Sequence, residues 1–161
     1  MTQLAQRAEQ VGALLKAREE TVAVAESSAG GVISAALLAV AGASAYFKGG
    51  GVVYTSEAKQ TLMAVTDEAM ADARAATETH ALHLARAARD RLGADWGIGE
   101  TGAAGPTGNR YGDAPGHTCI AVSGPREKAV TIETGDDGRE QNMWAFATAA
   151  LNLLEECICS E

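Results

Sequence analysis

Hydrophobic residues recur at helical spacing near the start of the chain. Four of them share one face over positions 2–18, with polar residues between them: Leu4, Val11, Leu14 and Leu15. This period predicts an amphipathic helix that ends in the charged segment KAREE. The run TVAVAE at 21–26 is short and rich in Val and Ala, which indicates a buried strand. The longer apolar run at 32–40 predicts a buried helix.

The next pattern surrounds three consecutive glycines with aromatic and β-branched residues, between positions 46 and 54. It predicts a strand with a bulge or a close backbone approach, ending at Tyr54. The segment SEAKQTLM that follows predicts a helix with Ser56 as N-cap and Lys59 in its first turn.

The second half of the chain repeats the alternation of helix and strand. TETHALHLARAARDRLG predicts a helix that Thr77 can cap and Gly93 can end, and ADWGIGETG predicts a strand. The segment at 101–117 has five glycines and two prolines in seventeen residues, which indicates an irregular loop. A hairpin around Gly124 and a helix at 139–157 complete the chain. The expected fold is a single α/β domain over 1–161, with a mixed sheet covered by helices.

Composition narrows the classes of partner. The net charge of -8 disfavours nucleic acid and anionic lipid as main partners, although a local cluster of N–H groups or one arginine can still bind a small phosphorylated ligand. Cys119, Cys157 and Cys159 lack CxxC spacing, so neither a disulfide framework nor a zinc site is expected. Without a secretory signal or an apolar stretch of membrane length, we expect a cytoplasmic protein.

Three polar, irregular segments each follow a predicted strand: 26–31, 54–59 and 101–117. Ligands of open α/β sheets usually bind beyond the carboxyl ends of the strands, so these segments meet at one site if their strands are parallel.

The segment AESSAGG at 25–31 has two interpretations. Ser27 or Ser28 could be a nucleophile beside backbone N–H groups that Gly30 and Gly31 leave uncovered. Taken alone, such a segment more commonly forms a capped turn with no catalytic role.

Lysine, arginine and histidine side chains supply further candidates. Lys59 could be a general base if burial lowers its pKa, with Tyr54 as its partner, or it could be an ordinary exposed lysine beside a core aromatic. Arg110 could clamp a phosphate, and His117 could be a base or a polar residue that starts a strand. His80 and a second histidine three residues later lack the accompanying ligands of a metal site.

Taken together, three ordered motifs resemble the C-terminal domain of the competence/damage-inducible CinA proteins, a family that includes stand-alone nicotinamide mononucleotide deamidases. The family pattern reads approximately A-E-S-C-T-G-G, then P-G-S-S-x-x-F-x-x-G-x-V-x-Y-S-N-x-A-K, then T-G-x-A-G-P-x-G-G. This chain has AESSAGG, AGASAYFKGGGVVYTSEAK and TGAAGPTGN in that order. The resemblance covers nearly the whole chain.

The resemblance implies a three-layer α/β/α sandwich with a mixed, mostly parallel sheet. It also implies an amidohydrolase that releases ammonia from the carboxamide of nicotinamide mononucleotide or a related pyridine nucleotide, with no metal and no cofactor. Carried over by motif, Ser27 is the nucleophile, Lys59 the base and Tyr54 the assisting residue. The expected substrate-binding residues lie in the glycine turn and the long loop: Gly30, Gly31, Thr101, Gly102, Ala104, Gly105, Gly108 and Arg110.

The sequence departs from the family pattern at three places. Ser28-Ala29 replaces Cys-Thr, and GDAPGH replaces the usual KPVG at the end of the loop. Met143 stands where the family usually carries a second phosphate-binding arginine, four residues after Arg139. The alternative function is therefore a ligand-binding or regulatory domain with reduced turnover. The sequence leaves the oligomeric state open, although the Ala-rich helices and the apolar C-terminal segment are compatible with a homo-oligomer.

Overall fold

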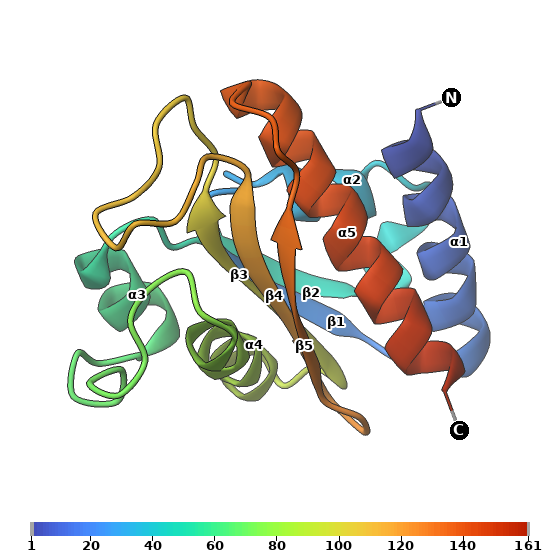
Figure 1. Cartoon of the computed structure of the whole chain (residues 1–161). Helices are drawn as coiled ribbons and strands as arrows, with labels where there is room; N and C mark the ends of the chain where they lie inside the picture. The colour runs from blue at the N-terminus through green and yellow to red at the C-terminus, as the bar shows by residue number, and fades with distance from the viewer. Residues whose placement is uncertain (1, 161) are drawn as a thin grey trace.

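A five-stranded mixed sheet forms the centre of the computed structural model, which describes residues 2–160 (Figure 1). Its strands are β1 (Val22–Glu26), β2 (Phe47–Val52), β3 (Trp96–Ala103), β4 (His117–Ser123) and β5 (Lys128–Glu133). Their order is β2-β1-β3-β4-β5, in which β2, β1 and β3 are mutually parallel. Because β4 is antiparallel to both β3 and β5, every strand except β4 runs in the same direction. The mixed, mostly parallel sheet is confirmed.

Helices cover both faces of the sheet (Figure 1). The helices α1 (Gln3–Arg18), α2 (Val32–Leu38) and α5 (Arg139–Cys159) share the larger core with one face. The helices α3 (Ser56–Met63) and α4 (Glu78–Leu92) pack on the other face, and a short 3-10 helix η1 spans Ala43–Ala45. The predicted three-layer architecture is therefore confirmed. No helix within residues 2–160 combines the length and apolar character needed to cross a membrane.

The glycine-rich strand β2 has the two features that its sequence predicts. The pairing with β1 shifts between Val22–Phe47 and Ala23–Gly49, so Lys48 is the extra residue of a bulge. A Cβ at Gly50 would lie 2.5 Å from the Ser34 hydroxyl of α2, which means that the helix approaches the strand closely.

One predicted helix boundary is wrong. The N-cap of α3 is Thr55, whose hydroxyl accepts the N–H of Ala58 at 3.1 Å, whereas Ser56 is already helical. The predicted cap at Thr77 and the stop at Gly93 are confirmed for α4. The hairpin of β4 and β5 is confirmed as well.

The parallel direction of β1, β2 and β3 decides where the polar segments lie. All three strands end at the same edge of the sheet, so the segments that follow them meet there. The sequence-based expectation of convergence is confirmed.

Candidate active site

Two clefts open at this edge of the sheet, and Tyr54 lines both of them. The first, here named the loop cleft, has a volume of about 260 Å³. It is lined by Ser28, Tyr54, Arg139 and seven residues that follow Thr101: Gly102, Ala103, Ala104, Gly105, Thr107, Gly108 and Asn109. The second, the Lys59 cleft, has a volume of about 350 Å³. Its polar lining includes Tyr54, Ser56, Lys59, Asp67, Arg74, His80, Arg110 and Tyr111.

The turn after β1 is held by the carboxylate of Glu100, which is fully buried on β3. One oxygen of this carboxylate accepts the backbone N–H groups of Ser27 at 3.0 Å and Ala29 at 2.8 Å. The other oxygen accepts the hydroxyl of Ser28 and, at 2.7 Å, that of Thr118. Burial raises the pKa of Glu100, and these hydrogen bonds oppose the rise. Both serines are therefore fixed by a residue that the sequence analysis missed.

The carboxylate of Glu26 holds the other side of the turn. It accepts the backbone N–H groups of Ile33 at 3.0 Å and Ser34 at 2.9 Å, together with the Ser34 hydroxyl. An anionic group at this end of α2 also interacts favourably with the helix dipole.

The two glycines of the turn differ in what they offer to a ligand. The N–H of Gly30 donates to the carbonyl of Ser27 at 3.0 Å, which differs from the expectation that it is uncovered. Within residues 2–160, the backbone N–H groups of Ser28 and Gly31 have no hydrogen-bond partner. These two groups are the donors available to an oxyanion.

Lys59 is buried, with an exposed fraction of 8%, so the interpretation as an exposed lysine is wrong. Its Nζ donates to Nε2 of His80 at 2.9 Å, and Nδ1 of His80 lies 2.9 Å from the carbonyl of Ala73. Burial lowers the pKa of Lys59, whereas the charge of Glu100 opposes that change. Lys59 thus has the environment that a general base requires.

Ser27 and Lys59 lie near the same carboxylate but are not hydrogen-bonded to each other in the described part of the chain. Glu100 binds the N–H of Ser27, and it is close enough to Lys59 for its charge to act on the amine. Ser27 is 7% exposed, and its hydroxyl has no hydrogen-bond partner among residues 2–160. The hydroxyl is therefore not held by another described residue, but Ser27 itself lines neither the loop cleft nor the Lys59 cleft.

Tyr54 is 60% exposed, so the interpretation as a core aromatic is wrong. Its hydroxyl oxygen accepts Nη2 of Arg139 at 3.3 Å, and Nη1 of the same guanidinium donates to the carbonyl of Gly105 at 2.6 Å. Arg139 therefore joins the aromatic ring to the long loop across the mouth of the loop cleft.

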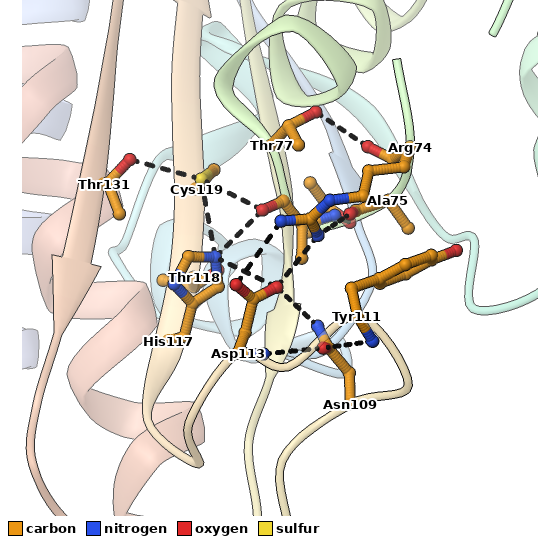
Figure 2. A network of polar contacts seen from close by, with 12 residues as sticks. Arg74, Ala75, Thr77, Asn109, Tyr111, Asp113, His117, Thr118, Cys119 and Thr131 are labelled. Carbon is orange, nitrogen blue, oxygen red and sulfur yellow. Dashed lines mark hydrogen bonds and ion pairs between the residues drawn. The ribbon is translucent and has the colours of Figure 1, made fainter. Parts of the chain in front are cut away.

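Asp113 fastens the far part of the long loop (Figure 2). Its carboxylate accepts Arg74 at 2.9 Å and the side-chain amide of Asn109 at 2.8 Å. Figure 2 also shows His117 beside Asp113. One ring nitrogen of His117 faces the carbonyl of Ala76 at 2.9 Å, and the other contacts Glu133 at the β5 end. This stretch of loop is tied to the chain that precedes α4.

Arg110 lies in the Lys59 cleft, not in the loop cleft. The ring centroid of Tyr111 lies 4.7 Å from the guanidinium carbon of Arg74 and 5.0 Å from that of Arg110. Arg74 is paired with Asp113, whereas Arg110 has no carboxylate partner among residues 2–160. Arg110 is therefore the cation of this pair that remains available to an anionic ligand.

The other predicted binding residues fall into two groups. Gly102, Ala104, Gly105 and Gly108 line the loop cleft. Thr101 is buried, and its hydroxyl accepts the N–H of Ala76 at 3.0 Å, so it supports the loop instead of lining either cleft. Within the described residues, no group of three His, Cys, Asp or Glu side chains could hold a metal ion.

Comparison with known proteins assigns the chain to a family. The family model described as "CinA C-terminal domain" matches residues 4–158. The chain belongs to this family. The CinA-like protein of Gloeobacter violaceus is 40% identical over 144 residues, which are 88% of this chain and 34% of that protein. The CinA-like protein of Synechocystis sp. is 40% identical over 147 residues, which are 89% of this chain and 35% of that protein. This CinA domain thus spans about a third of the length of the curated relatives it matches.

Solved structures agree with this assignment. The competence/damage inducible protein CihA of Agrobacterium tumefaciens is 28% identical, with a TM-score of 0.90, over 98% of this CinA domain and 96% of that chain. The competence-damaged protein of the CinA superfamily from Escherichia coli is 25% identical, with a TM-score of 0.88, over 95% of this CinA domain and 89% of that chain.

The departures from the family pattern have structural consequences in this CinA domain. A Cβ at Gly30 would lie 2.6 Å from the terminal methyl carbon of Met143, so the methionine covers the turn where the pattern places a cation. The neighbouring Asn142 is buried and donates to the carbonyl of Ala104 at 2.7 Å. The methyl group of Met143 therefore puts an apolar surface beside the turn of Ser27.

Proposed function

We propose that this CinA domain is an amidohydrolase that releases ammonia from the carboxamide of nicotinamide mononucleotide or a related pyridine nucleotide. In this proposal Ser27 is the nucleophile, Lys59 is the general base and Tyr54 assists at the mouth of both clefts. The backbone N–H groups of Ser28 and Gly31 stabilise the oxyanion. No metal and no cofactor enter the reaction.

The observation that carries the proposal is the environment of Lys59. Its amine is buried, has a neutral imidazole as hydrogen-bond partner and has a lowered pKa, while Lys59 lines a cleft together with Tyr54. A lysine can act as a base near neutral pH only when a fraction of it is uncharged, and burial is what produces that fraction. An ordinary structural lysine keeps its charge in water or pairs with a carboxylate.

The reaction divides into two balanced steps. Lys59 takes the proton of the Ser27 hydroxyl while its oxygen attacks the carboxamide carbon. The Lys59 ammonium then returns that proton to the leaving nitrogen, which departs as ammonia and leaves an ester on Ser27. In the second step Lys59 takes a proton from water while the water oxygen attacks the ester carbon. The Lys59 ammonium then returns that proton to the Ser27 oxygen, which restores the hydroxyl and the neutral base as the acid product leaves. The oxyanion of each step accepts hydrogen bonds from the turn.

The two clefts suggest how a mononucleotide would be held. The loop cleft offers backbone groups of Gly105 and Gly108 and the guanidinium of Arg139. The Lys59 cleft offers Arg110 to an anionic group of the substrate. Because Met143 replaces the second arginine of the family pattern, Arg110 is our candidate for the cation that takes over its role.

A second candidate function is a ligand-binding or regulatory domain with reduced turnover. It is favoured by the absence of a Ser27–Lys59 hydrogen bond within residues 2–160 and by the methyl group of Met143 over the turn. This candidate keeps both clefts but predicts binding without ammonia release.

The test is ammonia release from nicotinamide mononucleotide and a panel of related amides. Wild type is compared with Ser27→Ala, Lys59→Met and the control Lys48→Met, which alters an exposed lysine on β2. We expect both site variants to lose activity by about 100-fold or more and the control to keep it. Activity that survives both site variants would refute the mechanism. If wild type releases no ammonia while the nucleotide raises its melting temperature, the binding function is the correct one.

A further inference from the structure

His80 lies on α4 and is buried, with an exposed fraction of 4%. Its imidazole spans the space between α3 and the turn that precedes α4, because it contacts Lys59 on one side and Ala73 on the other. Neither the family motifs quoted above nor the proposed reaction assigns a role to this residue.

The hydrogen-bond partners fix the tautomer of His80. The carbonyl of Ala73 can only accept, so Nδ1, at 2.9 Å from it, carries the proton. Nε2 therefore has a lone pair, and this lone pair faces the Lys59 amine at 2.9 Å. The imidazole thus acts as an acceptor toward Lys59.

The surroundings of His80 keep the ring uncharged. Burial lowers the pKa of His80 to about 4, the hydrogen bond to Ala73 opposes this, and the charges of Lys59 and His83 lower it further. Lys59 in turn contacts the neutral ring of His80 and is acted on by the charge of Glu100, and the charged side chains of Asp67, Arg74 and Arg110 line the same cleft. The carboxylate of Glu100 accepts hydrogen bonds from the serine turn, so His80 is the direct hydrogen-bond partner of the Lys59 amine.

We propose that His80 is a positioning residue for the Lys59 base: its Nε2 lone pair holds the amine at the cleft without adding a negative charge. The inference rests on the proposed function for its role in turnover. A carboxylate in the same place would hold the amine equally well but would favour the ammonium form. A neutral imidazole gives a fixed position and leaves the amine able to lose its proton.

The arrangement also accounts for both states of Lys59 during the reaction. The neutral amine donates one N–H to Nε2, which leaves its own lone pair for the Ser27 proton. The ammonium that forms keeps the same hydrogen bond and directs its remaining protons to the cleft. His80 neither gives nor takes a proton, so its role differs from that of a catalytic histidine.

The first test measures kcat, KM and the pH profile of ammonia release for three variants. His80→Leu removes the acceptor, His80→Gln supplies an uncharged acceptor at the place of Nε2, and Thr79→Ala, at an exposed position of the same helix, is the control. We expect His80→Leu to lower kcat about 10- to 100-fold while KM changes less than about twofold, since a misplaced base costs rate more than binding. His80→Gln should restore much of the loss, and the control should match wild type.

The pH profile separates positioning from a merely structural role. The neutral acceptor also stabilises the ammonium, so its loss lowers the pKa of Lys59 and moves the acid limb of the profile to lower pH. A structural defect would lower the rate by the same factor at every pH. His80→Leu with the kcat and the acid limb of wild type would overturn the proposal.

The second test needs no turnover, so failure of the proposed function can be told apart from failure of this inference. Long-range ¹H–¹⁵N NMR of the whole chain reports which ring nitrogen of His80 carries the proton. In wild type we expect the Nδ1–H tautomer from pH 8 down to about pH 5. The variant Lys59→Met removes the hydrogen-bond partner of Nε2 and is measured for comparison. A ring with its proton on Nε2, or one that is charged at pH 6, would overturn the inference whatever the activity. A neutral Nδ1–H ring in a wild type that releases no ammonia would refute the proposed function alone.

Discussion

Replacing Glu100 is the sharpest test of how the nucleophile turn is held. This carboxylate is fully buried and accepts four hydrogen bonds, two from backbone N–H groups and two from hydroxyls. Glu100→Ala leaves the N–H groups of Ser27 and Ala29 unpaired, and each unpaired buried donor costs about 1–3 kcal/mol. The two hydroxyls can rotate toward other acceptors, so we count only the backbone groups. The expected loss of unfolding free energy is therefore about 2–6 kcal/mol.

Glu100→Gln is the matched conservative change. Its amide oxygen can still accept both N–H groups, while its NH₂ requires the hydroxyls of Ser28 and Thr118 to become acceptors. Charged hydrogen bonds contribute about 1.5–3 kcal/mol and neutral ones about 0.5–1.5, so we expect a loss of about 1–3 kcal/mol, smaller than that of alanine. The control is Glu9→Gln on the exposed part of α1, which should change the stability by less than about 0.5 kcal/mol.

Urea denaturation followed by circular dichroism measures these differences directly. The m-value should stay constant across the variants, because the same surface is exposed on unfolding. If Glu100→Ala costs less than about 1 kcal/mol, the carboxylate does not hold the turn and the reasoning is refuted. A stable Glu100→Gln variant should also release ammonia more slowly, because neutral hydrogen bonds hold the backbone of Ser27 less firmly than charged ones do.

Two further predictions concern the long loop. Arg110→Gln should raise KM about 10- to 100-fold for an anionic amide such as nicotinamide mononucleotide, which corresponds to one lost charged hydrogen bond. It should leave KM unchanged for the riboside analogue, which lacks the phosphate. Equal shifts of KM for both substrates in ammonia-release kinetics would contradict this assignment. For His117, burial opposes the charged ring, but the contacts with Ala76, Glu133 and Asp113 prevail and raise its pKa above 6.5. The stability that protonated His117 contributes is then fully present below pH 6.5 and is lost as the pH rises through the higher folded-state pKa. Urea melts of wild type and His117→Gln should therefore differ more at pH 6 than at pH 9, and a difference that grows with pH would be contrary evidence.

The positions of the clefts follow from features that the sequence carries locally. Each polar segment comes after a short run of β-forming residues, and helix signals such as Thr77 and Gly93 separate the runs. Alternation of strand and helix favours parallel strands, and parallel strands end at one edge. The α3 cap was predicted one residue too late because Thr55 and Ser56 both carry hydroxyls. The extended backbone of Thr55, with φ -117° and ψ 164°, decides between them.

The partners of the two catalytic candidates could not be predicted in the same way. Glu100 binds a turn that lies 71–73 residues earlier, and His80 binds a lysine 21 residues earlier, so neither pairing has a local signal. Each residue nevertheless stands out at its own position. A carboxylate inside the strand sequence WGIGETG is an anomaly, because both faces of β3 are buried there. His80 lies at helical spacing from the buried residues Leu84 and Ala88, which places it on the inner face of α4.

The central claim of a Ser27 nucleophile is tested most directly by ammonia release from nicotinamide mononucleotide in Ser27→Ala and Ser28→Ala, measured beside wild type. Both serines are equally buried, but only the hydroxyl of Ser28 is bound to Glu100. We predict one ammonia per nicotinate mononucleotide in wild type, no release above background in Ser27→Ala and a reduced but measurable rate in Ser28→Ala. Release by Ser27→Ala at the wild-type rate, or its loss in Ser28→Ala alone, would contradict the account.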